Sequence, residues 1–393
     1  MSILRIFNPE HDLALAFGGT NYTPPPMARL LKRDLQLLPA WIGGSGDSVL
    51  SQDVDLDVKW LKDLNDRYDL GVDVVSVGQI EHFNEIQPWG WNKFLQRRLF
   101  LDGAKAEALK SDIDIENIRK LSHRRISIEV HRRFLERVEG LRDLTPVECI
   151  SLDEVLDFAR RYPCAYTKAP WSSSGKGIYR ALDINGLDFT RWCSGIIKRQ
   201  GSIMCEKPLN SVLDFAMEFK CCKGVSEFVG YSIFNNDAHS SFSGGLLGST
   251  ELLQNKIVQT LCDERLLNDV REVACIIIDE LISPYYEGFL GIDMMIYRDD
   301  SGELCLNPCI ELNLRTTMGV VSSIIGNRIL DNGVEGTFHV DFFKTPITEE
   351  YCNELISKNP LQITTNGKIK SGVQFLTPLY KDAQYCAYIS VHD

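Results

Sequence analysis

Two stretches of the sequence carry carboxylates, an amide and a guanidinium at spacings that suit a metal site. Asp293 is the one charged residue in an apolar run, GFLGIDMMIY, where a charge is costly unless it is paired or bound to a cation. Glu311, Asn313 and Arg315 alternate, so in a strand they share one face. Carboxylate and amide oxygens suit Mg²⁺. The pattern predicts a magnesium site at Asp293, Glu311 and Asn313; a surface strand with an Arg–Glu pair is the alternative.

A hairpin is expected to bring these residues together. Residues 298–302 have the composition of a turn. Folding the two strands about that turn places Asp293 opposite residues 308–311. Pro308 cannot donate a ladder hydrogen bond, so it is expected to mark a bulge that adjusts the register.

The segment KAPWSSSGKG, from Lys168 to Gly177, combines small and basic side chains. Small residues let backbone N–H groups approach phosphate oxygens, and the lysines add positive charge. The loop is not a Walker A motif, because Pro170 stands where the first Gly belongs and Gly177 replaces the Ser or Thr. A phosphate cradle is one interpretation and a plain hairpin turn is the other. The cradle residues are Lys168, Ser172, Ser173, Ser174, Gly175, Lys176 and Gly177.

A third segment, IMCEKPL at residues 203–209, ends a predicted strand in an extended stretch. Pro208 stops strand pairing, so backbone groups just before it are left to bind the edge of an adenine. An ordinary strand end is the alternative.

In their order along the chain, these pieces resemble the ATP-grasp superfamily, which includes biotin carboxylase and D-alanine–D-alanine ligase. The resemblance spans roughly residues 115–345. It implies that Glu206, Lys207 and Leu209 contact adenine and ribose, and that Lys168 and the small-residue loop cover the phosphates. It also implies that the metal residues hold two Mg²⁺ ions and that Lys256 reaches toward the phosphates.

The chain departs from the family pattern at one position. Where the family has an earlier nucleotide-binding lysine, this sequence reads Ser-His-Arg-Arg at residues 122–125. An arginine must therefore substitute, either Arg124 or Arg125, and Arg124 is taken as the nucleotide-binding residue.

The resemblance implies an ATP- and Mg-dependent, ADP-forming ligase that joins a carboxylate to an amine or thiol through an acyl phosphate. Arg315, Lys168 and Lys176 would be catalytic. Such chemistry needs positioning and charge neutralisation and requires no protein nucleophile. A small-molecule kinase is a second hypothesis. A non-catalytic nucleotide-binding module is a third, and the presence of all the metal residues disfavours it.

The elements expected around these residues change character along the chain. Strand Ile3–Phe7, helix Met27–Leu38 and strand Asp73–Val77 alternate, which predicts a small open α/β domain over residues 1–112, similar to a pre-ATP-grasp domain. The resemblance implies that residues 113–345 form an ATP-grasp fold of two α+β lobes sandwiching ATP, divided near residue 205. Residues 346–393 are expected to add a closing strand pair.

Several elements of the second region are expected from local pattern. A Ser-x-x-Glu capping box predicts a helix over Ser151–Arg161, and a long helix is expected over residues 264–281. The expected strands are 164–169 with 178–182, 202–206, 214–220 with 230–234, and 289–297 with 303–315, followed by the closing pair 374–379 and 385–391.

Two N-terminal segments allow alternative interpretations. Residues 8–12 (NPEHD) follow the first strand, where open α/β sheets place ligands; they contact substrate or start a helix with Asp12 as N-cap. Residues 89–92 (WGWN) form an aromatic substrate wall or pack a domain interface.

Composition narrows the class of protein. The 393 residues carry 42 Lys plus Arg against 54 Asp plus Glu, a net charge of −12, which has the wrong sign for a nucleic-acid binder. The twelve cysteines show no C-x-x-C spacing, so a disulfide scaffold is not expected. No stretch approaches the ~20 apolar residues of a membrane span. We expect a cytoplasmic enzyme with small-molecule carboxylate and amine substrates; a dimer is compatible with the sequence.

Overall fold

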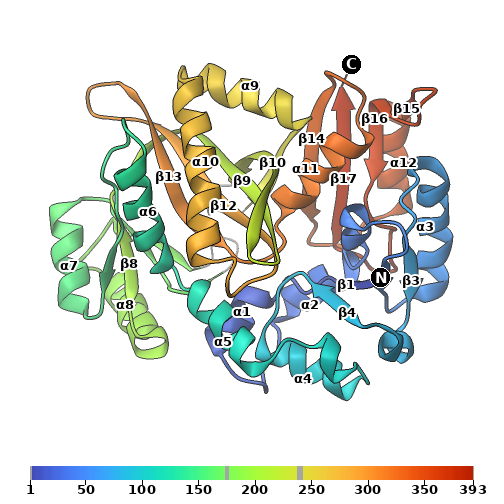
Figure 1. Cartoon of the computed structure of the whole chain (residues 1–393), viewed down its shortest axis with the longest axis horizontal. Helices are drawn as coiled ribbons and strands as arrows, with labels where there is room; N and C mark the ends of the chain where they lie inside the picture. The colour runs from blue at the N-terminus through green and yellow to red at the C-terminus, as the bar shows by residue number, and fades with distance from the viewer. Residues whose placement is uncertain (1, 173–176, 237–241, 393) are drawn as a thin grey trace.

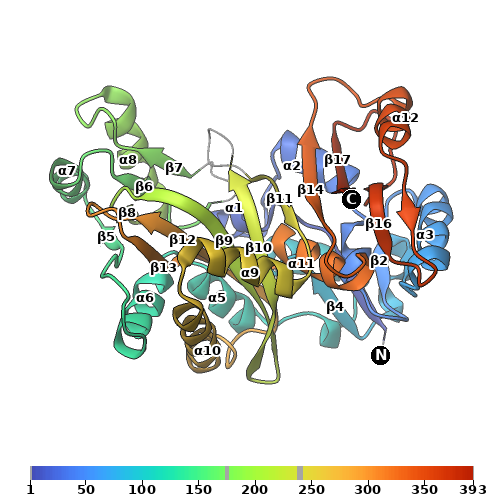
Figure 2. The same cartoon turned by 90° about the horizontal axis from the view of Figure 1, so that it is seen from above.

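The computed structural model describes residues 2–172, 177–236 and 242–392, which form three β-sheets with helices around them. The small sheet that carries α7 and α8 lies at one end of the long axis (Figure 1). Helices α3 and α12 lie at the other end, and the view from above agrees (Figure 2). Among the described helices, none combines the length and the apolar character needed to cross a bilayer.

The N-terminal sheet is parallel, with strand order β3-β2-β1-β4. Its strands are β1 (Ile3–Ile6), β2 (Ser48–Leu50), β3 (Asp73–Val75) and β4 (Glu85–Pro88). The helices that connect and follow them are α1 (His11–Phe17), α2 (Pro26–Asp34), η1 (Leu38–Ile42), α3 (Val54–Tyr68), η2 (Val77–His82), α4 (Lys93–Leu101) and η3 (Ala106–Ala108). The helix expected to reach Leu38 ends at Asp34. Leu38 instead begins a separate 3-10 turn, and as the residue before Pro39 it is disfavoured in an α-helix.

The second sheet is antiparallel, with order β5-β8-β6-β7. Helices α5 (Asp112–Leu121) and α6 (Ile126–Arg137) precede it. The sheet and its helices are β5 (Val147–Cys149), α7 (Leu152–Arg161), β6 (Tyr166–Lys168), β7 (Ile178–Arg180), α8 (Leu187–Gln200) and β8 (Ile203–Glu206). As expected, Ser151 caps α7 by accepting a hydrogen bond from the Glu154 backbone.

The third sheet has nine strands in the order β13-β12-β9-β10-β11-β14-β17-β16-β15. These are β9 (Asn210–Cys222), β10 (Val225–Asn236), β11 (Phe242–Leu247), β12 (Gly288–Arg298), β13 (Leu304–Asn313), β14 (Glu335–Phe342), β15 (Gln362–Ile363), β16 (Ile369–Phe375) and β17 (Tyr385–His392). Helices α9 (Thr250–Leu261), α10 (Glu264–Leu281), α11 (Met318–Ile329) and α12 (Glu349–Lys358) accompany it. The C-terminal strand pair therefore extends the large sheet.

The two faces of the large sheet carry different residues. Along β9, Phe215, Met217 and Phe219 are buried in one apolar cluster with residues of α10. Because side chains alternate along a strand, Ala216 and Glu218 point to the opposite face. That opposite face carries the polar residues of interest and packs against α11.

The hairpin of β12 and β13 has the expected register. Asp293 pairs with Glu311, whereas Met295 pairs with Asn307, so the register shifts between these pairs. The shift leaves Pro308 in a bulge, as predicted. Leu312 and Leu314 are buried in the apolar cluster on the other face, which leaves the alternating polar residues of β13 on the face of Asp293.

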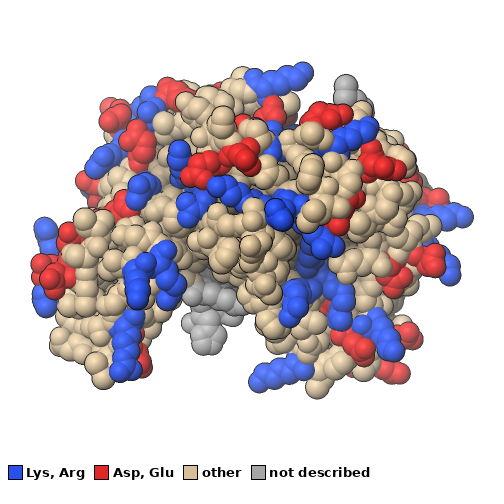
Figure 3. Space-filling model, turned by 90° about the horizontal axis from the view of Figure 1, so that it is seen from below, with Lys and Arg blue, Asp and Glu red and all other residues tan. Residues whose placement is uncertain are grey.

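Charge is unevenly distributed over the surface. On the face seen from below, basic side chains lie across the middle of the molecule although the chain is acidic overall (Figure 3). All twelve cysteines are free thiols.

Candidate active site

Neighbouring strands of the large sheet place carboxylates side by side. Asp293 on β12 pairs with Glu311 on β13 and with Ala216 on β9. Glu218, two residues beyond Ala216, pairs with Gly291. All three acidic side chains therefore lie on one face of adjacent strands, and two of them were expected from the sequence.

Asp293 has the most strongly perturbed environment of the three. Burial raises the pKa of its carboxyl well above the usual range, and the charges of Glu311 and Glu218 raise it further. Asn313 Nδ2 donates a hydrogen bond to Asp293 Oδ2 at 3.1 Å, and Arg315 Nη2 donates to Asn313 Oδ1 at 3.3 Å. Two of the three predicted metal residues, Asp293 and Asn313, are thus in contact, and Glu311 is the strand partner of Asp293.

This set of donors fits a divalent cation. Two carboxylates on facing strands and an adjacent amide supply the oxygen ligands that Mg²⁺ takes in proteins. Repulsion by the neighbouring carboxylates contributes to the raised pKa of Asp293. A cation bound between the carboxylates would remove that repulsion. Asp293, Glu311 and Asn313 are the residues that would hold it.

Arg124 connects the metal carboxylates to the small-residue loop. Its side chain is 7% exposed, and Nη2 lies 2.6 Å from Glu311 Oε1. Nη1 donates to Ala169 O at 2.5 Å and to Ser172 Oγ at 2.6 Å. Arg125 instead pairs with Glu148, where it is largely exposed. The geometry therefore selects Arg124, not Arg125, as the arginine at the site.

Lys168 and Glu206 form an ion pair at the ends of adjacent strands. Lys168 Nζ lies 2.6 Å from Glu206 Oε2, and both side chains are largely buried. Antiparallel pairing of β6 with β8 brings them together. Lys207 lies over the ring of Tyr162, 5.1 Å from its centroid, and Leu209 is half-buried between β8 and β9.

The two ends of the small-residue loop are held together. Ala169 N donates to Gly177 O at 2.7 Å. A Cβ atom at Gly177 would overlap the side chain of Ser172, so the close approach requires glycine. Residues 173–176, which include the predicted loop residues Ser173, Ser174, Gly175 and Lys176, lie outside the described residues.

A small cavity opens between this loop and β13. Asp12, Ser172, Glu311 and Asn313 are among the residues that line it. Arg315 Nε donates to Asp12 Oδ2 at 2.8 Å, so the first helix contacts the site directly. A helix does start in this segment, as one interpretation expected, but it begins at His11 and its N-cap is Glu10. Asp12 lies in the first turn, so its assignment as the N-cap is wrong.

Lys256 lies apart from this arrangement. It is within α9, and its Nζ pairs with Glu335 Oε2 at 2.7 Å. Both side chains are more than a third exposed. In the described part of the chain, no hydrogen bond or ion pair joins Lys256 to another predicted site residue, so the structure gives no support to its assignment as a phosphate ligand.

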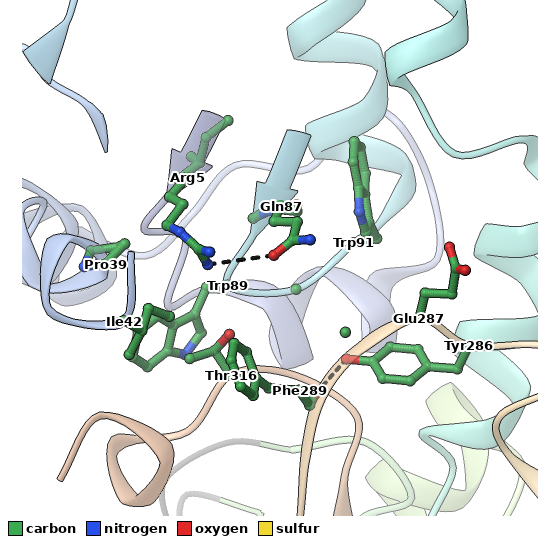
Figure 4. Close-up of a pocket in the computed structure, with 14 residues that line it drawn as sticks. Arg5, Pro39, Ile42, Gln87, Trp89, Trp91, Tyr286, Glu287, Phe289 and Thr316 are labelled. Atoms are coloured by element: carbon green, nitrogen blue, oxygen red, sulfur yellow. Dashed lines mark hydrogen bonds between the residues drawn. The ribbon is translucent and has the colours of Figure 1, made fainter. Parts of the chain in front are cut away.

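A second hollow lies where the N-terminal sheet meets the start of β12, and Trp89 and Trp91 form part of its wall (Figure 4). Its charged lining is already paired: Arg5 contacts Asp47, and Glu287 contacts Lys110. The carbonyl of Trp89 accepts a hydrogen bond from Thr316 N at 2.8 Å. These contacts favour the packing interpretation of the aromatic segment.

Glu218 is the site residue that the sequence analysis missed. It is 1% exposed; Ser232 Oγ donates to its Oε1 at 2.9 Å, and Thr317 Oγ1 donates to its Oε2 at 3.0 Å. Burial raises its pKa to about 7. The signal that could have found it is the one used for Asp293, a single carboxylate inside an apolar strand (FAMEF).

Comparison with known proteins places the fold. No protein-family model and no curated protein matches the chain. Among solved structures, biotin carboxylase of Campylobacter jejuni, in a β-γ-ATP complex, aligns with a TM-score of 0.55 and 12% identity, covering 100% of this chain and 87% of that one. The biotin carboxylase domain of 2-oxoglutarate carboxylase from Hydrogenobacter thermophilus gives 0.53 and 11%, with 100% and 86% coverage.

A third structure, a pyruvate carboxylase variant of Rhizobium etli, gives a TM-score of 0.52 and 10% identity, and this chain covers 36% of it. Biotin carboxylase belongs to the superfamily that the motif order resembles. The chain therefore has the ATP-grasp fold.

Proposed function

We propose that the protein is an ADP-forming ligase that uses Mg-ATP to join a carboxylate to an amine or thiol through an acyl phosphate. One observation carries this proposal: Asp293 and Glu311 face each other on one hairpin, and an arginine contacts the group at each end. Arg124 contacts Glu311, and Arg315 contacts Asn313. Such a cluster can hold both a divalent cation and the phosphates of a nucleotide.

The nucleotide would lie between the small sheet and the large one. We assign Lys168 and the loop from Ser172 to Gly177 to the phosphates, and Glu206 with Lys207 to the adenosine. Support comes from the closeness of Lys168 to Glu206. The H. thermophilus structure, which has the same fold, is a complex with MgADP, ADP and bicarbonate.

The proposed reaction has two steps. A carboxylate oxygen of the substrate attacks the γ-phosphorus and ADP leaves; the amine then attacks the acyl carbon and phosphate leaves. When bound, Mg²⁺ supplies charge neutralisation on the polyphosphate. Within the chain, Lys168 and Arg124 orient the phosphates, and Arg315 stabilises the negative charge that develops on the transferred group.

Arg315 is prepared for this role by its neighbours. Asp12 and Asn313 accept hydrogen bonds from its guanidinium, which fixes the direction of the planar group. A fixed cation needs little reorganisation when charge develops. Asp12 lines the cavity beside Glu311, so we assign the N-terminal segment to the substrate side of the site.

The other parts of the proposal come from the sequence. The enzyme would bind two Mg²⁺ ions, act on small-molecule substrates and be located in the cytoplasm. Lys176 would be a further catalytic residue. A kinase would use the same nucleotide site, and the products distinguish the two activities.

The test is ADP release from Mg-ATP with pooled carboxylates and amines, with products identified by mass spectrometry. We expect ADP only when an acceptor pair is present. Glu311→Gln should lose turnover and keep the circular dichroism spectrum of the wild type. Turnover that survives this substitution would refute the metal assignment, and a phosphorylated product formed without an amine would indicate a kinase.

A further inference from the structure

Glu218 is a buried carboxylate that the proposed reaction does not use. It lies on β9, the strand next to β12, and its side chain is on the same face of the sheet as Asp293. Each of its oxygens accepts one hydrogen bond, from Ser232 and from Thr317. Burying a carboxylate is costly, so its presence beside two other acidic groups calls for a physical reason.

The chain makes room for this side chain on two sides. A Cβ atom at Gly291 would lie 2.6 Å from Glu218 Oε2, and one at Gly319 would overlap Oε1. Gly291 is on β12 and Gly319 is in the first turn of α11. Two glycines thus shape a space that fits the carboxylate of Glu218 between the strand and the helix.

Hydrogen bonding alone does not account for a carboxylate at this position. Thr317 is the N-cap of α11, and its Oγ1 accepts from Val320 N while it donates to Glu218. A neutral glutamine could accept the Thr317 hydrogen bond and donate to Ser232 with the same shape. What glutamine would not supply is the negative charge.

That charge lies next to Asp293. Glu218 and Asp293 are diagonal neighbours on one face of β9 and β12. Arg124 already pairs with Glu311. In the described part of the chain no ion pair joins Asp293 or Glu218 to a basic side chain, and a divalent cation would balance their charge.

We propose that Glu218 is a third carboxylate of the cation site, a positioning residue whose charge strengthens binding of a divalent cation at Asp293 and Glu311. The inference rests on the proposed metal site. Glu218 would act through its charge, from the neighbouring strand, and would not itself ligate the ion.

The experiment measures Mn²⁺ affinity of the full chain by electron paramagnetic resonance, with ADP present. Glu218→Gln should weaken Mn²⁺ binding about tenfold, the lower end of what supporting residues contribute to metal sites. Ser232→Ala is the matched control, because it removes a hydrogen bond to Glu218 and keeps the charge; its Mn²⁺ affinity should stay close to that of the wild type.

A second matched pair separates charge from shape and covers a folding failure of the first variant. Glu218→Asp and Glu218→Asn are both shorter than the native side chain, but only the aspartate is charged. Aspartate should bind Mn²⁺ more tightly than asparagine, with thermal unfolding recorded for every variant. The proposal would be overturned if Glu218→Gln bound Mn²⁺ as tightly as Ser232→Ala, and Glu218→Asn as tightly as Glu218→Asp.

The design also separates this inference from the metal assignment on which it rests. If Asp293→Asn and Glu311→Gln weaken Mn²⁺ binding and Glu218→Gln does not, only the role of Glu218 is overturned. If none of the three substitutions changes the affinity, the metal site itself is refuted.

Discussion

The ion pair between Arg124 and Glu311 can be tested by a double-mutant cycle. Arg124→Met keeps the length of the side chain and removes the guanidinium, and Glu311→Gln keeps the shape and removes the charge. The free energy of unfolding would be measured by urea denaturation for the wild type, both single variants and the double variant, without nucleotide. The coupling energy isolates the pair from the other contacts of each residue.

The expected magnitude follows from the burial of the pair. Arg124 is 7% exposed and Glu311 is 22% exposed, and the two atoms are 2.6 Å apart. Exposed ion pairs contribute about 0.2–1 kcal/mol, whereas hydrogen bonds to charged groups contribute about 1.5–3 kcal/mol. Because this pair is mostly shielded from water, we expect a coupling energy of about 2 kcal/mol.

A coupling energy below about 0.5 kcal/mol, in the range of solvent-exposed pairs, would refute this reasoning. It would mean that Arg124 and Glu311 do not hold each other in solution. The connection that they make between the small-residue loop and the metal carboxylates would then be absent. Circular dichroism of each variant checks that all four proteins are folded before their stabilities are compared.

Three further outcomes are expected. Lys168→Met should weaken ADP binding, measured by calorimetry, because it removes the cation next to Glu206; unchanged affinity would contradict the phosphate assignment. Lys256→Ala should leave turnover unchanged, since the residue pairs with Glu335 at the surface; a large loss of kcat would instead support a role for Lys256 at the phosphates. Burial raises the pKa of Glu218 from 4.5 to about 7, so the folded state binds more protons between these values and stability should fall as pH rises from about 4.5 to 7. Urea titrations at pH 5 and pH 7.5 should show a smaller difference for Glu218→Gln than for the wild type, and an equal difference would contradict this assignment.

Local alternation explains why the hairpin could be predicted. Strand periodicity places Glu311 and Asn313 on one face, and a proline that cannot donate a hydrogen bond locates the bulge. The sequence alone therefore placed Asp293 opposite residues 308–311, and the structure pairs it with Glu311. The same reasoning applies to the cap of α7 at Ser151, whose partner is three residues away.

Contacts between distant segments of the chain could not be predicted from local pattern. Arg124 and Arg125 are equivalent in the sequence, and only the packing of α6 beside the loop directs one to Glu311 and the other to Glu148. The space that holds the Glu218 carboxylate depends on Gly319, which lies about a hundred residues later in the chain. Lys256 was assigned by motif order, whereas helix α9 turns its side chain toward Glu335.

The extent of the sheets also depends on long-range pairing. The closing pair was expected at residues 374–379 and 385–391. The second strand matches β17, whereas the first strand lies earlier than expected, at Ile369–Phe375. Nothing local indicates that β17 pairs with β14 and so extends a sheet of nine strands. The domain boundaries at residues 112 and 345 stay a prediction.

In the proposed reaction, the enzyme activates a carboxylate with ATP and transfers the acyl group to a second substrate. The most direct measurement is mass spectrometry of the products formed from Mg-ATP, a carboxylate and an amine, with ¹⁸O in the carboxylate. We predict that ¹⁸O passes to the released phosphate in step with ADP and ligated product, because the carboxylate oxygen attacks phosphorus. Ligated product and ADP formed without ¹⁸O in the phosphate would show that the carboxylate oxygen does not attack phosphorus and would rule out the acyl phosphate.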